Sequence, residues 1–251
     1  MDNKVPAVAL AFWIVKIMST TVGETGADYL AIHVGLGIGW TCAITITLLS
    51  LALAIQLRAG RYVPWIYWLT VVLVSVVGTQ ITDLLTDGLG ISLYISTASF
   101  AIALYTTFAT WYSCEQTLSI HTIVTTRREL FYWAAILLTF ALGTAAGDLA
   151  TEALGIGFTV GTMIFAAAIA VIVIAWRLGA NPILTFWITY ILTRPLGASL
   201  GDLLSQAKTY GGLGLGSAWT SVIFLAVIVT LVMVMTFRHR SPAAATEPAN
   251  R

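Results

Sequence analysis

The stretch TFALGTAAGDLA at residues 139–150 decides the fold, because related stretches occur three more times in the chain. They read STTVGETGADYL at 19–30, VSVVGTQITDLL at 74–85 and TRPLGASLGDLL at 193–204. In each copy a glycine follows a tryptophan by ten residues and precedes an aspartate by five: Trp13, Gly23 and Asp28; Trp68, Gly78 and Asp83; Trp133, Gly143 and Asp148; Trp187, Gly197 and Asp202. Such self-similarity predicts a protein built from four copies of one structural repeat.

The composition places these repeats in a membrane. Of the 251 residues, 59% are hydrophobic and 9% are charged, and the mean hydropathy is +0.92. A soluble domain of this length needs far more polar surface. Each repeat holds two apolar segments that can cross a bilayer core of about 30 Å: 6–31 and 39–57, 64–85 and 90–112, 129–152 and 157–176, 182–205 and 214–237. We expect an all-α integral membrane fold of eight transmembrane helices.

Loops and charges predict the topology. Short glycine-rich turns at 35–39, 87–90, 153–157 and 210–216 join the two segments of each repeat, so we expect those segments to be antiparallel neighbours. Nine of the twelve basic residues lie on the opposite side: Lys4, Arg58, Arg61, Arg127, Arg128, Arg177, Arg238, Arg240 and Arg251. The positive-inside rule makes that side, with both termini, cytoplasmic.

Two crossings per repeat also give all four repeats the same direction, so we expect parallel repeats. Residues 1–241 form one transmembrane domain in this interpretation. The polar, proline-rich tail at 242–251 is expected to be a disordered cytoplasmic segment.

The four repeat aspartates are the main candidates for function. An ionisable side chain at membrane depth costs roughly 2.5–3.5 kcal/mol, which favours a functional interpretation. The alternative is that these aspartates lie at the outer interface and cap the turns. Asp87 and Glu152, a few residues further along the chain, are assigned to that interface.

The remaining charges fall on the same helix face as the aspartates. At about 100° per residue, Lys16, Glu24, Arg194 and the aspartates share an arc of roughly 140°. We therefore expect the four faces to surround a central polar site. Glu24 and four aspartates against Lys16 and Arg194 give this face a formal charge of −3. Arg194 is expected to hold a permanent carboxylate partner, and Lys16 either to form a structural ion pair or to release a proton.

Carboxylate and hydroxyl oxygens suit hard cations. The candidate ion-binding residues are Glu24, Asp28, Asp83, Asp148, Asp202, Thr20, Thr21, Thr79 and Thr144, and the five carboxylates among them form the hypothetical metal site. No cysteine and histidine spacing of the metal-binding type is present, and the sequence indicates no cofactor. His33, near the outer face, is either a proton relay or incidental.

The tryptophans and glycines of the repeats have structural interpretations. Each tryptophan lies only four to seven residues inside a predicted helix, which favours an interfacial aromatic belt, with packing against a neighbouring repeat as the alternative. The glycines favour close helix packing, and a helix break is the alternative, particularly near Pro195, where we expect a bend.

The motifs KIMSTTVGETGADYL and YILTRPLGASLGDLL, with two intervening copies, resemble the bacterial membrane proteins made of four tandem two-helix repeats and catalogued as uncharacterised membrane-anchored proteins. The resemblance covers nearly the whole chain. It implies the repeat count and a bacterial inner-membrane location, and little about mechanism.

We expect a secondary transporter or exchanger of a small cation, with a divalent metal among the candidates, coupled to protons through the aspartate cluster. Its partners would be the lipid bilayer, the cation and protons, and the net charge of +1 does not favour nucleic acid. No nucleotide-binding motif of the Walker type is present.

Three other functions stay open. A cation channel would use a ring of acids, although the unequal repeats favour a carrier. An intramembrane aspartyl protease would use paired aspartates, but the strings before Asp148 and Asp202 lack the first glycine of Gly-x-Gly-Asp. A scaffold without transport activity would not need the aspartates at all. A retinal protein is disfavoured, because Lys16 lies in the first of eight segments.

Overall fold

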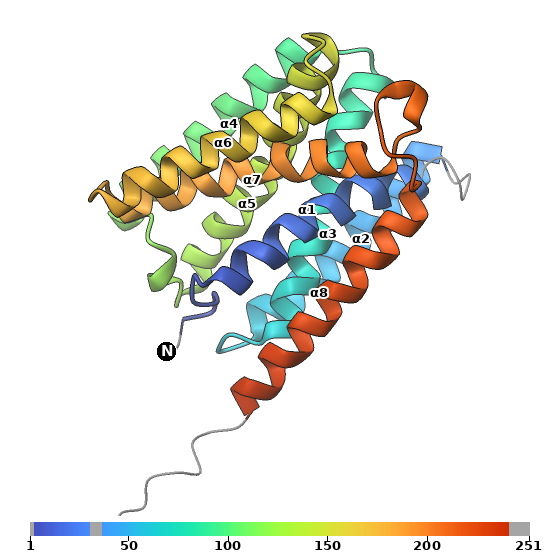
Figure 1. The fold of residues 1–251 in the computed structure, drawn as a ribbon. Helices are drawn as coiled ribbons and strands as arrows, with labels where there is room; N and C mark the ends of the chain where they lie inside the picture. The colour runs from blue at the N-terminus through green and yellow to red at the C-terminus, as the bar shows by residue number, and fades with distance from the viewer. Residues whose placement is uncertain (1–2, 31–36, 241–251) are drawn as a thin grey trace, which may run out of the picture.

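The protein is all-helical in the part of the chain that the structure, a computed structural model, describes: residues 3–30 and 37–240, with the side chains of Asp28, Ile38 and 238–240 left out (Figure 1). That part contains eight long α-helices and no strand: α1 Leu10–Asp28, α2 Gly37–Arg58, α3 Pro64–Asp83, α4 Leu93–Glu115, α5 Thr126–Asp148, α6 Phe158–Arg177, α7 Pro182–Ser205 and α8 Ser217–Arg240. All eight expected segments are helical. The expected tail at 242–251 and His33 lie outside the described residues.

Helices α2 to α8 are long and apolar enough to cross a membrane. The chain is therefore a multi-pass membrane protein. Helix α1 is shorter, at 19 residues, and carries Lys16, Glu24 and Asp28. Pro64 and Pro182 begin α3 and α7, where a missing N–H costs no hydrogen bond.

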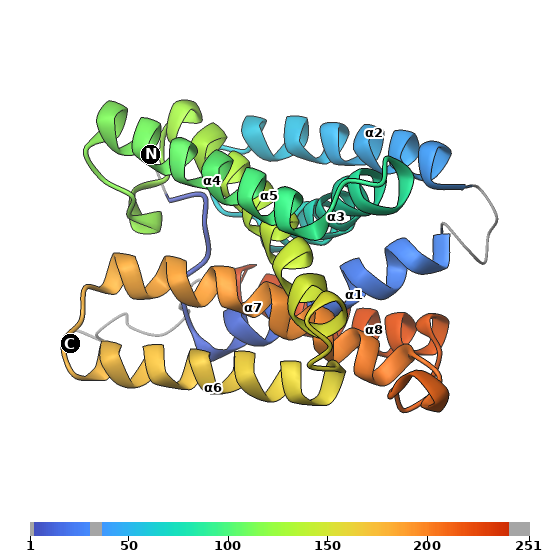
Figure 2. The ribbon, with the colours of Figure 1, turned by 90° about the horizontal axis from the view of Figure 1, so that it is seen from above.

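Four helices form an inner ring. Helix α1 contacts α3, α3 contacts α5, α5 contacts α7, and α7 returns to α1. Each even-numbered helix packs outside this ring: α2 on α3, α4 on α5, α6 on α7 and α8 on α1. Figure 2 shows α2 and α4 on one side of the molecule and α6 and α8 on the other.

This arrangement corrects one expectation. The two helices of a repeat were expected to be packed neighbours, but the second helix packs chiefly on the first helix of the next repeat, and α8 closes the circle on α1. A short turn determines where the second helix of a repeat begins. Side-chain packing then determines which inner helix it contacts.

The four repeat glycines lie where neighbouring inner helices approach most closely. A methyl group added to Gly78 would lie 2.6 Å from Cβ of Phe140, and one added to Gly197 would lie 2.5 Å from Cγ2 of Thr20. The equivalent contacts of the other two glycines are Gly23 with Ser75 and Gly143 with Arg194. The helices run unbroken through all four glycines and through Pro195, so none of these positions is a helix break.

The repeat tryptophans correct a second expectation. Trp68, Trp133 and Trp187 are at most 4% exposed and Trp13 is half-buried, so these four do not form an interfacial belt. In every repeat an aromatic residue comes directly before the tryptophan, and it contacts the tryptophan of the next repeat. The ring centroids are 5.5 to 6.2 Å apart in the four pairs: Phe12 with Trp68, Tyr67 with Trp133, Tyr132 with Trp187 and, from the last repeat to the first, Phe186 with Trp13. We call these eight residues the aromatic layer. Such ring pairs each add about 0.5–1.5 kcal/mol beyond area burial.

Candidate functional site

In each inner helix a series of residues spaced four apart runs from the aromatic layer to the repeat aspartate, and its described members are buried or half-buried. Counted from the aromatic layer toward the repeat aspartates, the series are Phe12, Lys16, Thr20, Glu24 and Asp28; Tyr67, Val71, Ser75, Thr79 and Asp83; Tyr132, Ile136, Phe140, Thr144 and Asp148; Phe186, Tyr190, Arg194, Ala198 and Asp202. Except for half-buried Phe186, Asp83 and Asp148, every described member is buried. A spacing of four keeps these residues on one slowly winding stripe.

Arg194 lies at the centre of this stack and is fully buried. Its Nη2 donates hydrogen bonds to Glu24 Oε2 at 2.8 Å, to Thr144 Oγ1 at 2.5 Å and to Thr79 Oγ1. Its Nη1 donates to the backbone oxygen of Thr20 at 2.9 Å. One side chain of α7 therefore binds α1, α3 and α5 together, and Glu24 is the carboxylate partner of Arg194.

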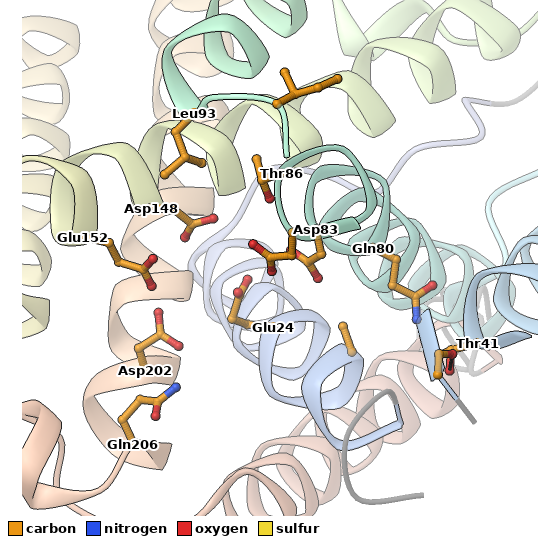
Figure 3. Close-up of a pocket in the computed structure, with 14 residues that line it drawn as sticks. Glu24, Thr41, Gln80, Asp83, Thr86, Leu93, Asp148, Glu152, Asp202 and Gln206 are labelled. Carbon is orange, nitrogen blue, oxygen red and sulfur yellow. Dashed lines mark hydrogen bonds between the residues drawn. The ribbon is translucent and has the colours of Figure 1, made fainter. Parts of the chain in front are cut away.

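An acidic cavity of about 470 Å³ lies on the aspartate side of Arg194 (Figure 3). Six carboxylate side chains line it: Glu24 of α1, Asp83 and Asp87 around the end of α3, Asp148 and Glu152 around the end of α5, and Asp202 of α7. The described lining includes no lysine, arginine or histidine. Four repeats thus contribute acids to one cavity. Asp28 ends α1, and its side chain lies outside the described residues.

The structure corrects the assignment of Asp87 and Glu152 to the interface alone. Both are exposed, but both line the cavity with the repeat aspartates. Each lies four residues after a repeat aspartate, in a π-helical turn that extends the helix: Leu84–Gly88 after α3 and Leu149–Ala153 after α5. Residues four apart share a helix face, a signal that the sequence carries. Glu24 and Asp202 are buried, and Asp83 and Asp148 are half-buried. Exposure therefore increases from Glu24, beside Arg194, toward Asp87 and Glu152.

The threonines proposed as ion ligands have a different position. Thr20, Thr21, Thr79 and Thr144 are buried and do not line the cavity. Thr79 and Thr144 accept hydrogen bonds from Arg194, and Thr21 Oγ1 donates to the backbone oxygen of Gly197 at 3.0 Å. These hydroxyls position Arg194 and join helices. Thr41 and Thr86, which the sequence did not single out, line the cavity instead.

Lys16 is buried without a carboxylate partner within ion-pair distance in the described part of the chain. Its Nζ lies 3.8 Å from the ring centroid of Phe140 and 4.4 Å from that of Tyr190, and donates to Thr20 Oγ1 at 3.3 Å. The expected structural ion pair is not formed in the described part of the chain: Glu24 pairs with Arg194, and the Lys16 amine lies against two ring faces.

A second buried ion pair, which the sequence did not predict, lies at the end of the bundle where the odd-numbered helices begin, here called the tryptophan end. Lys4 Nζ lies 2.7 Å from Glu129 Oε2, and it also donates to the backbone oxygen of Leu57 at 3.1 Å. Gln56 Nε2 donates to Glu129 Oε1 at 3.0 Å. Burial raises the pKa of nearby Tyr62 to about 12, which keeps its phenol neutral. This network fastens the segment before α1 to α2 and α5.

The described residues do not form a ready-made metal site. Among them, no three side chains of the His, Cys, Asp and Glu types gather closely enough to hold one ion. The carboxylates line different walls of the cavity. The arrangement can attract positive charge and exchange protons, but it does not present a compact coordination shell.

A family model described as Repeat of Unknown Function (DUF347) matches residues 11–62, 66–117, 131–179 and 185–241. The chain belongs to this family. The four matched segments are the four repeats predicted from the tryptophan, glycine and aspartate spacing, and the resemblance to uncharacterised repeat-built membrane proteins is confirmed. No curated protein and no solved structure matches the chain.

Proposed function

We propose that this protein of the DUF347 repeat family is a secondary transporter or exchanger of a small cation. The observation that carries the proposal is the acidic cavity, which has six carboxylates and no basic residue in its described lining. Carboxylates gathered around one cavity repel one another, and a bound cation or a proton relieves that repulsion. Competition between the two for the same carboxylates would couple cation movement to proton movement.

The inner ring supports a carrier rather than a channel. Directly behind the cavity, Arg194 fills the axis of the ring and bonds to the other three inner helices. Behind Arg194 follow Lys16 and the aromatic layer, and then the Lys4–Glu129 pair. A guanidinium on the axis opposes passage of a cation, so transport would require the inner helices to rearrange.

The repeating contacts support the finer topology. We infer that α1 is an eighth transmembrane helix, that the four repeats run in parallel, and that their inner faces surround a central polar site. In this proposal the protein lies in the bacterial inner membrane, with the basic tryptophan end and both termini in the cytoplasm. The cavity then opens to the outside.

Purified protein in liposomes loaded with a pH-sensitive dye would test this function. Addition of the chloride salts of Na⁺, K⁺, Mg²⁺ and Mn²⁺ and of putrescine dihydrochloride, one at a time, should move protons across the membrane with at least one of them, faster than in protein-free liposomes and at a rate that saturates. Asp148→Asn and Asp202→Asn should abolish the signal. Glu115→Gln, outside the cavity, should retain it.

Two outcomes would contradict the proposal. A non-saturating flux without proton exchange would indicate a channel. No response to any of these cations, in protein that remains folded, would remove the transport function.

A further inference from the structure

The cavity is large for a single bare ion. Its volume of about 470 Å³ corresponds to roughly fifteen water-sized volumes. It falls instead in the range of about 300–1,000 Å³ that is typical of sites for small organic molecules. An ion that loses its water would contact only a small part of this lining.

The spacing of the carboxylates also disfavours a dehydrated metal. Ca²⁺ or Mg²⁺ needs several oxygen ligands within about 2.6 Å, and no three of the described acids come together in that way. Glu24 already pairs with Arg194. The other five acids are distributed over the ends of α3, α5 and α7, as Figure 3 shows. Such a lining matches several positive charges that are separated from one another.

Gln80 gives an independent indication of a ligand. It lines the cavity and is only 3% exposed, yet its Nε2 has no hydrogen-bond partner within the described chain. Its Oε1 lies 2.5 Å from Thr45 Oγ1, and Oγ1, which has a single proton, also lies 2.9 Å from the backbone oxygen of Thr41. A half-turn of the amide would let Nε2 donate to Thr45 and would leave Oε1 as an acceptor without a partner in the cavity wall.

Apolar groups lie between these polar ones. Ala27, Ile91 and Leu93 are part of the same lining. Their methyl and methylene groups suit a short hydrocarbon chain between charged ends, because such contact keeps apolar surface of both partners from water.

We propose that the cargo of this cavity is an organic cation with two or more separated ammonium groups, a diamine or polyamine. This inference rests on the proposed function and names its substrate class. The ammonium groups bind to the acids at the ends of α3, α5 and α7, one of them also donates to Gln80, and the methylene spacer lies against Ile91 and Leu93.

Calorimetric titration of the full-length protein in detergent tests the substrate class with four probes: butylamine, putrescine, MgCl₂ and MnCl₂. Putrescine should bind at least about tenfold more tightly than butylamine, since its second ammonium adds a buried charge pair of about 1.4 kcal/mol or more. Asp148→Asn and Gln80→Leu should each weaken putrescine binding. Asp87→Asn, at an exposed position, provides a variant that does not endanger folding and should weaken it by a smaller factor. Glu115→Gln should have no effect.

The outcomes separate this inference from the proposed function. Equal affinities for putrescine and butylamine, together with saturable binding of Mg²⁺ or Mn²⁺ that Asp148→Asn removes, would overturn the diamine inference and leave cation transport standing. Binding of none of the four probes would overturn the diamine inference, and transport of Na⁺ or K⁺ in the liposome assay would still support the proposed function. Putrescine binding that none of the cavity variants weakens would also overturn the inference.

Discussion

Nη2 of Arg194 and Oε2 of Glu24 lie 2.8 Å apart, although the two residues are separated by 170 positions in the chain. This pair joins the last repeat to the first and forms the base of the acidic cavity. It is also the point at which the structural core and the candidate binding site meet, because Arg194 is fully buried whereas Glu24 lines the cavity.

Removal of one partner of this pair should destabilise the protein strongly. Arg194→Met leaves Glu24 as an unpaired buried charge, and such losses cost about 3–5 kcal/mol. The double variant Arg194→Met with Glu24→Gln removes both charges and should recover a large part of that loss. Thermal unfolding of the wild type, of Arg194→Met, of Glu24→Gln and of the double variant in detergent measures the coupling. A double variant no more stable than Arg194→Met would contradict the importance of the pair.

The repeat glycines should tolerate no methyl group. In Gly23→Ala the added methyl would overlap Ser75 of α3, and overpacking of this kind costs about 1–3 kcal/mol. Gly26, one turn further along α1, has nothing within 4 Å of an added methyl, so Gly26→Ala should be neutral or stabilising by up to about 1 kcal/mol. The difference in unfolding temperature between the two variants is the test. Equal effects would show that the close approach of α1 and α3 is not required.

Lys16 should be replaceable by an uncharged side chain of similar volume. Because its amine contacts ring faces and has no carboxylate partner in the described residues, Lys16→Met should change the free energy of unfolding by less than about 1.5 kcal/mol. If Lys16 were half of a buried ion pair, the loss would be about 3–5 kcal/mol. Unfolding measurements distinguish the two values.

The Lys4–Glu129 pair should keep the tryptophan end closed. Ile136→Cys, in a background without Cys42 and Cys114, introduces a thiol at a fully buried position of the inner face. A membrane-impermeant maleimide applied to the tryptophan end should label it slowly, and Glu129→Gln should increase the labelling rate. The native Cys114, exposed at the end of α4 and kept as the single cysteine of a matched protein, reports any general change in reactivity. No increase at Ile136→Cys would mean that this pair does not control access.

Much of the fold follows from the sequence, because membrane helices have simple requirements. Each of the eight expected segments became a helix, with most boundaries within four residues. The arc predicted for Lys16, Glu24, Arg194 and the aspartates of α3, α5 and α7 holds buried or cavity-lining side chains, because side-chain direction on a helix depends on position along the chain. The glycine spacing marked the close contacts, although it did not show which helix each glycine meets.

What the sequence could not provide is the choice of partners. A tryptophan near a helix end is compatible both with an interfacial belt and with a contact to a neighbouring repeat. The ring contacts with Phe12, Tyr67, Tyr132 and Phe186 show that the second arrangement is formed. Two basic residues, Lys16 and Arg194, fall on the same predicted helix arc as Glu24. In the structure Arg194 is the one that lies within ion-pair distance of Glu24. Asp87 and Glu152 could have been assigned correctly, since each lies four residues after a repeat aspartate.

Cation accumulation in liposomes that contain the purified protein tests the central claim most directly. With an imposed pH gradient, the wild type should accumulate a labelled cation to saturation, and the double variant Asp83→Asn with Asp148→Asn should show no more uptake than protein-free liposomes. Glu115→Gln should match the wild type. Undiminished uptake by the folded double variant would contradict the claim that acids from different repeats act as one site.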